Sequence, residues 1–158
     1  LHVVTPDAKV LAHYDKVKLV PFGEFVPLRG ILPVEKIAHG MQDFSAGPGY
    51  TVMDNLPIPS FTPQICYEGI FPDASYQTEE TRAHWLVNVT NDAWFGISVG
   101  PYQHFEMTRM RAIEQGLPLA RSANSGISGI IDPIGRTLKN IPLGVEGIIT
   151  TQIPLRVE

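Results

Sequence analysis

Cys66 is the only cysteine in the chain, and it lies in the stretch QICYEGIFPD, residues 64–73. A lone cysteine is commonly a small buried side chain of the core. Here, however, Cys66 ends an apolar, strand-like run, and a helix-like segment follows within a few residues. A corner between a strand and a helix exposes a nucleophile and directs backbone N–H groups toward an oxyanion. Two interpretations are therefore open, a core filler and a catalytic nucleophile, and Glu68 close behind favours the second.

Lys16 is a candidate for the charged group that a reactive thiol requires. A cysteine acts as its thiolate, which a base or a nearby cation must favour. In YDKVKLVPFGEF, residues 14–25, Lys16 follows a strand-like run and Glu24 lies in the irregular loop behind it. A lysine that faces the thiolate would also donate to a developing oxyanion, and a glutamate beside it would keep it charged. The alternative is an ordinary solvated surface lysine.

Histidine is the usual base for a catalytic cysteine. None of the five histidines stands in a motif that pairs it with Cys66, and no two have the spacing of metal ligands: His2, His13, His39, His84 and His104. A scattered histidine is more often structural or exposed. The sequence therefore gives little support to a Cys–His pair.

The composition limits the classes of protein to which the chain can belong. Its 158 residues suffice for one domain, and a hydrophobic content of 44% allows a core without cross-links. The formal net charge is −4 at pH 7, so the basic face that nucleic acids require is not visible. A single cysteine excludes an internal disulfide and a zinc site with several cysteines.

The elements that would position these residues are short, because 14 glycines and 14 prolines divide the chain. LHVV and VLAHYDKV, on either side of TPDAK, predict a strand, a turn and a second strand. Residues 21–63 predict a long irregular stretch, which inside a compact domain is usually functional. A helix is expected from Pro72 or Asp73 onward, and HWLVNVT, residues 84–90, predicts a strand.

The strongest helix signal covers residues 102–116, with Pro101 before it and Gly116 as the residue that ends it. Four apolar residues at spacings of three, three and four are expected to form one stripe in the core: Met107, Met110, Ile113 and Leu117. Beyond the helix, four segments predict strands joined by tight turns, PLARSAN, GISGIIDP, RTLKN and GVEGIITTQIPL. The pattern predicts an α+β or layered α/β domain.

Several of these blocks together resemble the nitrilase, or carbon–nitrogen hydrolase, superfamily. They are YDKVKLVPFGEFVP, CYE and NVTNDAWFGISVGPYQHFEMTRMRAIEQGLPLARSANSGISGIIDPIGR. Within this superfamily, LVPFGEFVP and the TNDAWFG and GPYQH blocks are similar to the branch that acylates lipoproteins. The resemblance covers nearly the whole chain and implies a layered α-β-β-α sandwich of the nitrilase type, which we expect here without its first strands and helices.

The resemblance implies a Glu–Lys–Cys triad in which Cys66 is the nucleophile and carries a thioester acyl-enzyme. Lys16 would stabilise the tetrahedral oxyanion together with the backbone N–H of Tyr67. Two acidic residues match positions that support the lysine and the site, Glu24 and Glu68. Three residues of the loop after the next strand would shape the pocket wall: Asn91, Asp92 and Trp94.

The general base departs from the family pattern. In the family it is a glutamate well upstream of the lysine, yet the fifteen residues before Lys16 contain no glutamate. The chain also opens on LHVV as if a strand were already under way. We therefore expect residues 1–158 to be a single partial catalytic domain, with the upstream part of that domain and a transmembrane region outside them.

The resemblance implies transfer of a fatty acyl chain from a phospholipid to the N-terminal amine of a diacylglyceryl-cysteine lipoprotein. No metal, organic cofactor or nucleic acid would take part. The parent protein would lie in the bacterial inner membrane with this domain on its periplasmic face, and the loop of residues 25–37 is either a lipid contact or an ordinary packed loop. Two alternatives remain, a soluble amidase or carbamoylase that hydrolyses a small amide, and a non-catalytic binding domain.

Overall fold

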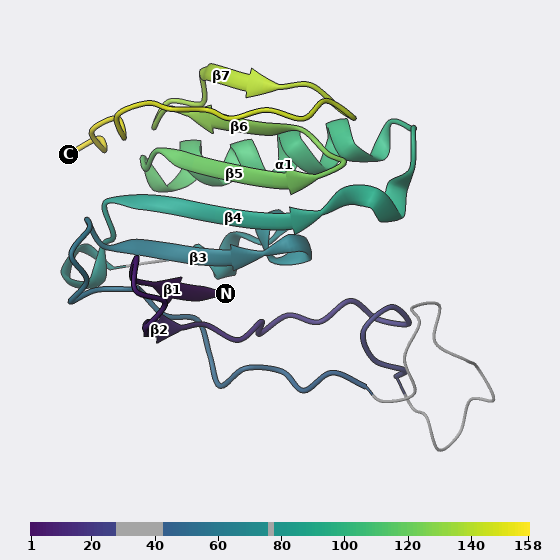
Figure 1. Cartoon of the computed structure of the whole chain (residues 1–158), viewed down its shortest axis with the longest axis horizontal. Coiled ribbons are helices and arrows are strands. Elements are labelled where there is room, and N and C mark those ends of the chain that lie inside the picture. Colours follow the sequence, from purple (N-terminus) through teal and green to yellow (C-terminus); the bar gives the residue numbers. More distant parts are fainter. Residues whose placement is uncertain (28–42, 76–77) are drawn as a thin grey trace.

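The computed structural model describes residues 1–27, 43–75 and 78–158, and its centre is a five-stranded mixed sheet (Figure 1). The strands follow one another across the sheet as β3 (Phe61–Ile65), β4 (Trp85–Asn91), β5 (Leu119–Asn124), β6 (Ser128–Ile131) and β7 (Thr137–Ile141). β3, β4 and β5 are parallel, whereas β6 and β7 continue the sheet antiparallel. The carboxyl ends of the three parallel strands therefore share one edge, where open α/β sheets form their ligand sites.

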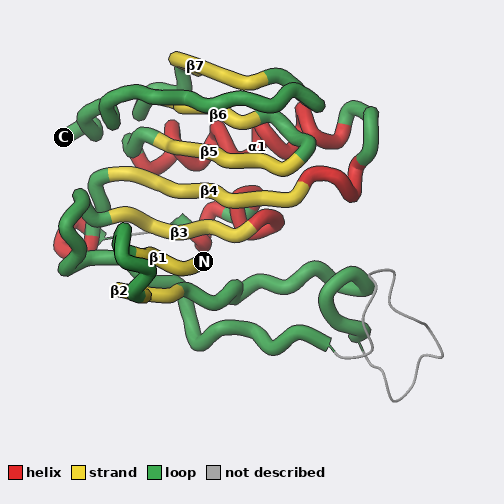
Figure 2. The backbone as a smooth tube through the Cα atoms, viewed as in Figure 1, coloured by secondary structure: helices red, strands yellow, loops and turns green. Residues whose placement is uncertain are grey.

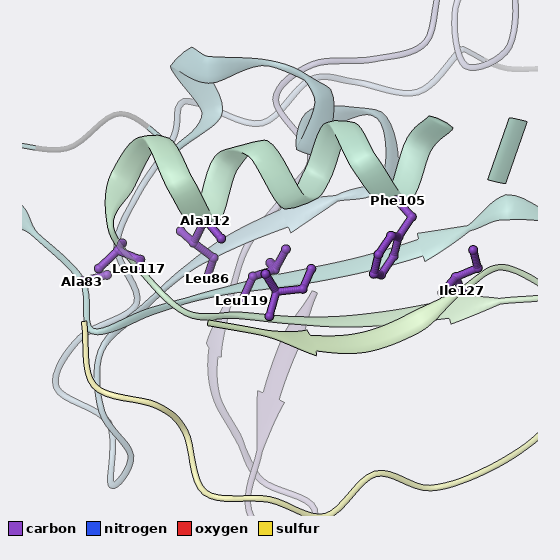
Figure 3. Close-up of a cluster of buried hydrophobic side chains, with 8 residues drawn as sticks. Ala83, Leu86, Phe105, Ala112, Leu117, Leu119 and Ile127 are labelled. Atoms are coloured by element: carbon purple, nitrogen blue, oxygen red, sulfur yellow. The ribbon is translucent and has the colours of Figure 1, made fainter. Parts of the chain in front are cut away.

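The helix α1 (Gly100–Gln115) covers one face of this sheet, and Figure 3 shows the apolar side chains between them. Alternation along β4 produces this face, because Leu86 is buried toward the helix while its neighbours Trp85 and Val87 pack on the other side. The parallel register places Leu119 beside Leu86. The buried cluster consists of Ala83, Leu86, Phe105, Ala112, Leu117, Leu119, Ile127 and Ile131.

A hairpin of β1 (His2–Val4) and β2 (Val10–His13) packs on the opposite face, as the strand–turn–strand pattern predicts. Tyr14, Met53 and Phe61 are buried together at this interface, and Trp85 of the sheet packs against them. The order of layers is therefore helix, sheet and hairpin. The predicted α+β architecture is confirmed.

Helix α1 has the predicted ends. Pro101 is in its first turn, and the chain leaves it at Gly116 with a left-handed φ of 61°. The predicted apolar stripe is wrong, because its three members within the helix are 40–48% exposed and only Leu117, beyond the helix, is in the core. The helix buries a mixed face instead, because polar groups of the sheet and of the Cys66 turn bind its polar members His104, Thr108 and Arg111. The buried residues of the helix are Pro101, His104, Phe105, Thr108, Arg111 and Ala112.

The helix predicted from Pro72 or Asp73 is also wrong for the described residues of that segment. They form two short 3₁₀ turns, Pro72–Ala74 and Glu79–Thr81. The hydroxyl of Thr81 accepts from the backbone N–H of Thr78 and contacts the Thr78 hydroxyl, so side chains give the backbone partners that compete with a helix.

The strands predicted after α1 are confirmed except for the last. Residues 144–158 form no strand. Their backbone is held by other groups, because Lys139 Nζ donates to the Thr150 carbonyl at 2.7 Å and the Val157 N–H donates to the Gly116 carbonyl at 2.9 Å. Hydrogen bonds therefore hold this segment against the domain, although it does not join the sheet.

The predicted irregular stretch, residues 21–63, is irregular in its described parts as far as residue 60, but its last three residues begin β3. Figure 2 shows its two arms, residues 14–27 and 43–60, running side by side as loop, and the N–H of Phe44 donates to the Glu24 carbonyl at 2.9 Å. Of the candidate lipid loop 25–37, Phe25 is half-buried and Val26 is buried, and residues 28–37 lie outside the described residues. In the described parts of the chain, no helix is long and apolar enough to cross a membrane.

Candidate active site

Cys66 lies at the corner between β3 and a short 3₁₀ helix, η1 (Cys66–Ile70). Its φ is 52°, in the left-handed region that residues other than glycine, asparagine and aspartate rarely adopt. Such strain persists only where the surrounding contacts impose it, and it concentrates at functional sites. The residue is half-buried rather than enclosed in the core. The predicted strand-to-helix corner is therefore present.

Glu68 anchors this corner from inside the protein. Its fully buried carboxylate accepts four hydrogen bonds of 2.7–3.1 Å, from the Tyr14 hydroxyl and from the backbone N–H groups of Val17, Lys18 and Ile65. Burial and the charge of Glu68 raise the pKa of the Tyr14 hydroxyl, so it remains a donor. Because its partners lie on both sides, Glu68 ties the segment that carries Lys16 to the turn that carries Cys66.

Glu68→Gln is expected to destabilise the protein, because the amide would place an N–H group against donors that now meet a carboxylate. Leaving such buried donors unpaired should lower the free energy of unfolding by about 3 kcal/mol. Denaturant unfolding followed by circular dichroism measures this. Glu106→Gln is the matched control, since Glu106 is exposed and pairs with Arg109 at the surface. Equal effects of the two substitutions would contradict the anchoring role of Glu68.

Lys16 and Glu24 form a close ion pair. Lys16 Nζ lies 2.7 Å from both carboxylate oxygens of Glu24, and the N–H of Val20 donates to one of them at 2.8 Å. The lysine side chain is only 9% exposed, so solvent screens the pair weakly. The interpretation of Lys16 as a solvated surface residue is therefore wrong. The pair holds the amino group of Lys16 in a fixed direction.

A cavity of about 450 Å³ opens onto Cys66. Glu24 lines it, and so do three residues that the sequence analysis singled out, Tyr67, Asn91 and Trp94. Most of the other lining side chains are apolar, among them Val20, Pro21, Ile70, Phe95 and Met107. The cavity therefore joins a thiol and the carboxylate partner of Lys16 to a mainly apolar space, while Lys16 itself is not among the lining residues.

Asp92 lies behind the cavity wall and belongs to a buried cluster. It opens the short 3₁₀ helix η4 (Asp92–Phe95), and its oxygens bind His104 Nδ1 at 2.8 Å and Arg121 Nη2 at 2.7 Å. Burial favours the neutral acid, but the hydrogen bond with His104 and the charge of Arg121 outweigh it and hold the pKa of Asp92 below its ordinary value. Burial lowers the pKa of the Arg121 guanidinium, and Asp92 opposes that effect. The cluster is therefore an ionised pair bound to an imidazole.

His104 and Arg121 are the site residues that the sequence analysis missed. His104 Nε2 lies 3.2 Å from the carbonyl oxygen of Cys66, beneath the nucleophile turn. A signal for Arg121 was present, because alternation in LARSAN places it on the same face as the buried Leu119, where a charge needs a partner. Within the described residues, no group of three or more potential ligands is arranged to hold a metal ion.

The family model described as carbon–nitrogen hydrolase matches residues 2–157, and the chain belongs to this family of enzymes. A curated relative from Bradyrhizobium diazoefficiens, named apolipoprotein N-acyltransferase, is 52% identical over 98% of the chain. A protein of the same name from Rickettsia typhi is 47% identical over 91% of the chain. The chain spans 29% of the length of each of these relatives.

The structural comparison points to the same fold. An amidase from Nesterenkonia sp. AN1, with the acetamide moiety of fluoroacetamide attached to its active-site cysteine, aligns with a TM-score of 0.61. The alignment covers 90% of this chain and 50% of that one, at 21% sequence identity. The nitrilase-type fold that the sequence motifs imply is confirmed.

Proposed function

We propose that the full-length protein is an apolipoprotein N-acyltransferase and that this chain carries its nucleophile. The observation that carries the proposal is the mainly apolar cavity against Cys66, which suits a fatty acyl chain better than a small polar amide. The names of the relatives support it. The donor would be a phospholipid and the acceptor the N-terminal amine of a diacylglyceryl-cysteine lipoprotein. We place the protein in the bacterial inner membrane, with this domain on the periplasmic face.

The reaction is an exchange in two steps. The thiolate of Cys66 attacks the ester carbonyl carbon of the phospholipid, and the carbon–oxygen bond to the lipid alcohol breaks as the thioester forms. The alcohol leaves with a proton as lysophospholipid. The amine of the acceptor then attacks the thioester, the carbon–sulfur bond breaks, and the proton lost by nitrogen returns to the thiol. Each tetrahedral intermediate has an oxyanion, which the Lys16 ammonium and the Tyr67 N–H would stabilise.

The base that accepts the thiol proton is inferred to come from elsewhere in the full-length protein. Both oxygens of Glu24 are bound by Lys16, and the two oxygens of Glu68 accept four hydrogen bonds. His104 Nε2 faces the Cys66 carbonyl. The two carboxylates and this imidazole are therefore committed to other partners, and a base must lie within hydrogen-bonding reach of its proton.

Product analysis tests the proposed function. The full-length protein in detergent is incubated with phospholipid and a synthetic diacylglyceryl-cysteine peptide, and the products are separated by liquid chromatography and mass spectrometry. Amide-linked acyl chain on the peptide amine, together with lysophospholipid, is expected. Release of the acyl chain only as free fatty acid, or turnover of small amides alone, would favour the amidase alternative.

Residues 1–158 expressed alone are expected to show no acyl transfer, because the base would be missing. A cysteine attacks as its thiolate, so the reaction requires a group that accepts the thiol proton. The same product analysis measures the activity, circular dichroism reports whether the piece is folded, and the full-length protein is the positive control. Turnover that disappears in Cys66→Ala would refute the expectation and place a base within these residues.

A further inference from the structure

The peptide unit between Cys66 and Tyr67 contains both a bound carbonyl and the proposed oxyanion donor. His104 Nε2 lies 3.2 Å from the Cys66 carbonyl oxygen and Nδ1 lies 2.8 Å from Asp92 Oδ1. Both oxygens only accept, so each ring nitrogen must carry a hydrogen for both contacts to be hydrogen bonds. The Tyr67 N–H belongs to the same peptide, which is planar and trans, so its C=O and N–H point in opposite directions. Whatever fixes the carbonyl therefore also fixes the direction of the N–H.

His104 is itself held firmly by buried partners. Its side chain is 5% exposed, and its Nδ1 lies 2.8 Å from Asp92 Oδ1. Arg121 Nη2 binds the other oxygen of Asp92 at 2.7 Å, and the Thr108 hydroxyl binds the His104 carbonyl at 2.8 Å. The Thr108 contact holds the backbone of His104, whereas Asp92 and the Cys66 carbonyl meet its two ring nitrogens, so the ring cannot rotate without losing contacts on both sides.

The cluster is also closely packed. A Cβ atom at Gly126 would collide with Asp92 Oδ2, and one at Gly69 would lie 2.9 Å from the Thr108 hydroxyl oxygen. The absence of a side chain at both positions lets the backbone approach the polar groups directly. Little space is left in which the imidazole could shift away from the Cys66 carbonyl.

We propose that His104 is a positioning residue that directs the Tyr67 N–H toward the oxyanion through its hydrogen bond to the Cys66 carbonyl. This inference rests on the proposed acyl transfer. A hydrogen bond to the carbonyl also polarises the peptide, which strengthens its N–H as a donor. The effect is confined to steps that develop an oxyanion. Alkylation of the thiol develops none and serves as an internal reference.

Two substitutions of His104 in the full-length protein test whether the hydrogen bond from Nε2 to the Cys66 carbonyl is what matters. Glutamine places its amide nitrogen near the position of Nε2, whereas asparagine reaches only the position of Nδ1. His104→Asn is expected to lower the rate of Cys66 acylation by phospholipid about 10²-fold at unchanged KM. His104→Gln should retain acylation within about fivefold of wild type, and alkylation by iodoacetamide should change less than about threefold in both.

His84→Asn is the matched control, because His84 is exposed and bonds Ser60, and it should keep wild-type rates. If His104→Asn does not fold by circular dichroism, His104→Leu replaces it with the same expectation. The positioning role is overturned by an acylation loss below about tenfold, by an equal loss in the glutamine variant, or by a matching loss of alkylation. A wild-type protein that alkylates but forms no acyl adduct would refute the proposed function instead.

Discussion

Cys66→Ser in the full-length protein is expected to abolish the acyl adduct that forms with phospholipid and to lower transfer by about 10⁴-fold or more. The serine hydroxyl is far less acidic than a thiol, so the same turn would present a group that is almost never ionised at neutral pH. Removing a nucleophile that works with its neighbours costs nearly the whole chemical step. Intact-mass measurement after incubation with phospholipid alone detects the adduct.

Wild-type protein alkylated with iodoacetamide is the control for this experiment, because it blocks the same sulfur without changing the sequence. Hydroxylamine should remove the adduct from wild type, since it cleaves thioesters. An adduct of undiminished yield in Cys66→Ser would show that another residue carries the acyl chain. In that event the strained turn at Cys66 would need a different explanation.

Lys16→Met is expected to lower the rate of Cys66 acylation by about 10²–10³-fold with little change in phospholipid affinity. Methionine keeps most of the length of the side chain but cannot donate to an oxyanion. In the wild-type protein, Lys16 Nζ lies 2.7 Å from both carboxylate oxygens of Glu24. The substitution removes this cation from Glu24. Single-turnover measurement of adduct formation at saturating phospholipid isolates the chemical step from binding.

Lys9→Met is the matched control for the lysine. Lys9 also pairs with a carboxylate, that of Asp7, but its side chain is 78% exposed and its partner does not line the cavity, whereas Glu24 does. Exposed ion pairs of this kind contribute little to the stability of a protein. An acylation rate of Lys16→Met within about twofold of wild type would contradict the oxyanion role of Lys16, because loss of one such donor typically lowers the rate about 10²–10³-fold.

The local part of the site was predictable from the sequence. The end of the strand at Cys66 could be predicted because an apolar run stops there, and such a run depends on neighbours in sequence. The helix expected from Pro72 or Asp73 was wrong, and the corner is instead completed by the 3₁₀ helix η1. Helix α1 was predicted, with its proline and glycine ends, because its signals likewise depend on neighbours in sequence. Its buried face was not, because the apolar spacing of Met107, Met110 and Ile113 cannot reveal that the sheet offers polar groups to the other side.

The contacts that complete the site were beyond sequence patterns because they join distant residues. His104 meets partners 12, 17 and 38 positions away, and Glu68 binds the N–H groups of residues 50 and 51 positions before it. No periodicity links such positions. The resemblance to a family marked Glu24 and Glu68 as supporting residues, but only the structure shows that their oxygens are already bound.

The paired arms on either side of residues 28–42 have a consequence for how this domain can change in evolution. The Phe44 N–H donates to the Glu24 carbonyl, and the Gly47 N–H donates to the Lys16 carbonyl at 2.7 Å. The second arm therefore holds the backbone of both members of the ion pair. A substitution within residues 43–60 can shift the ammonium group of Lys16 although Lys16 and Glu24 themselves are unchanged.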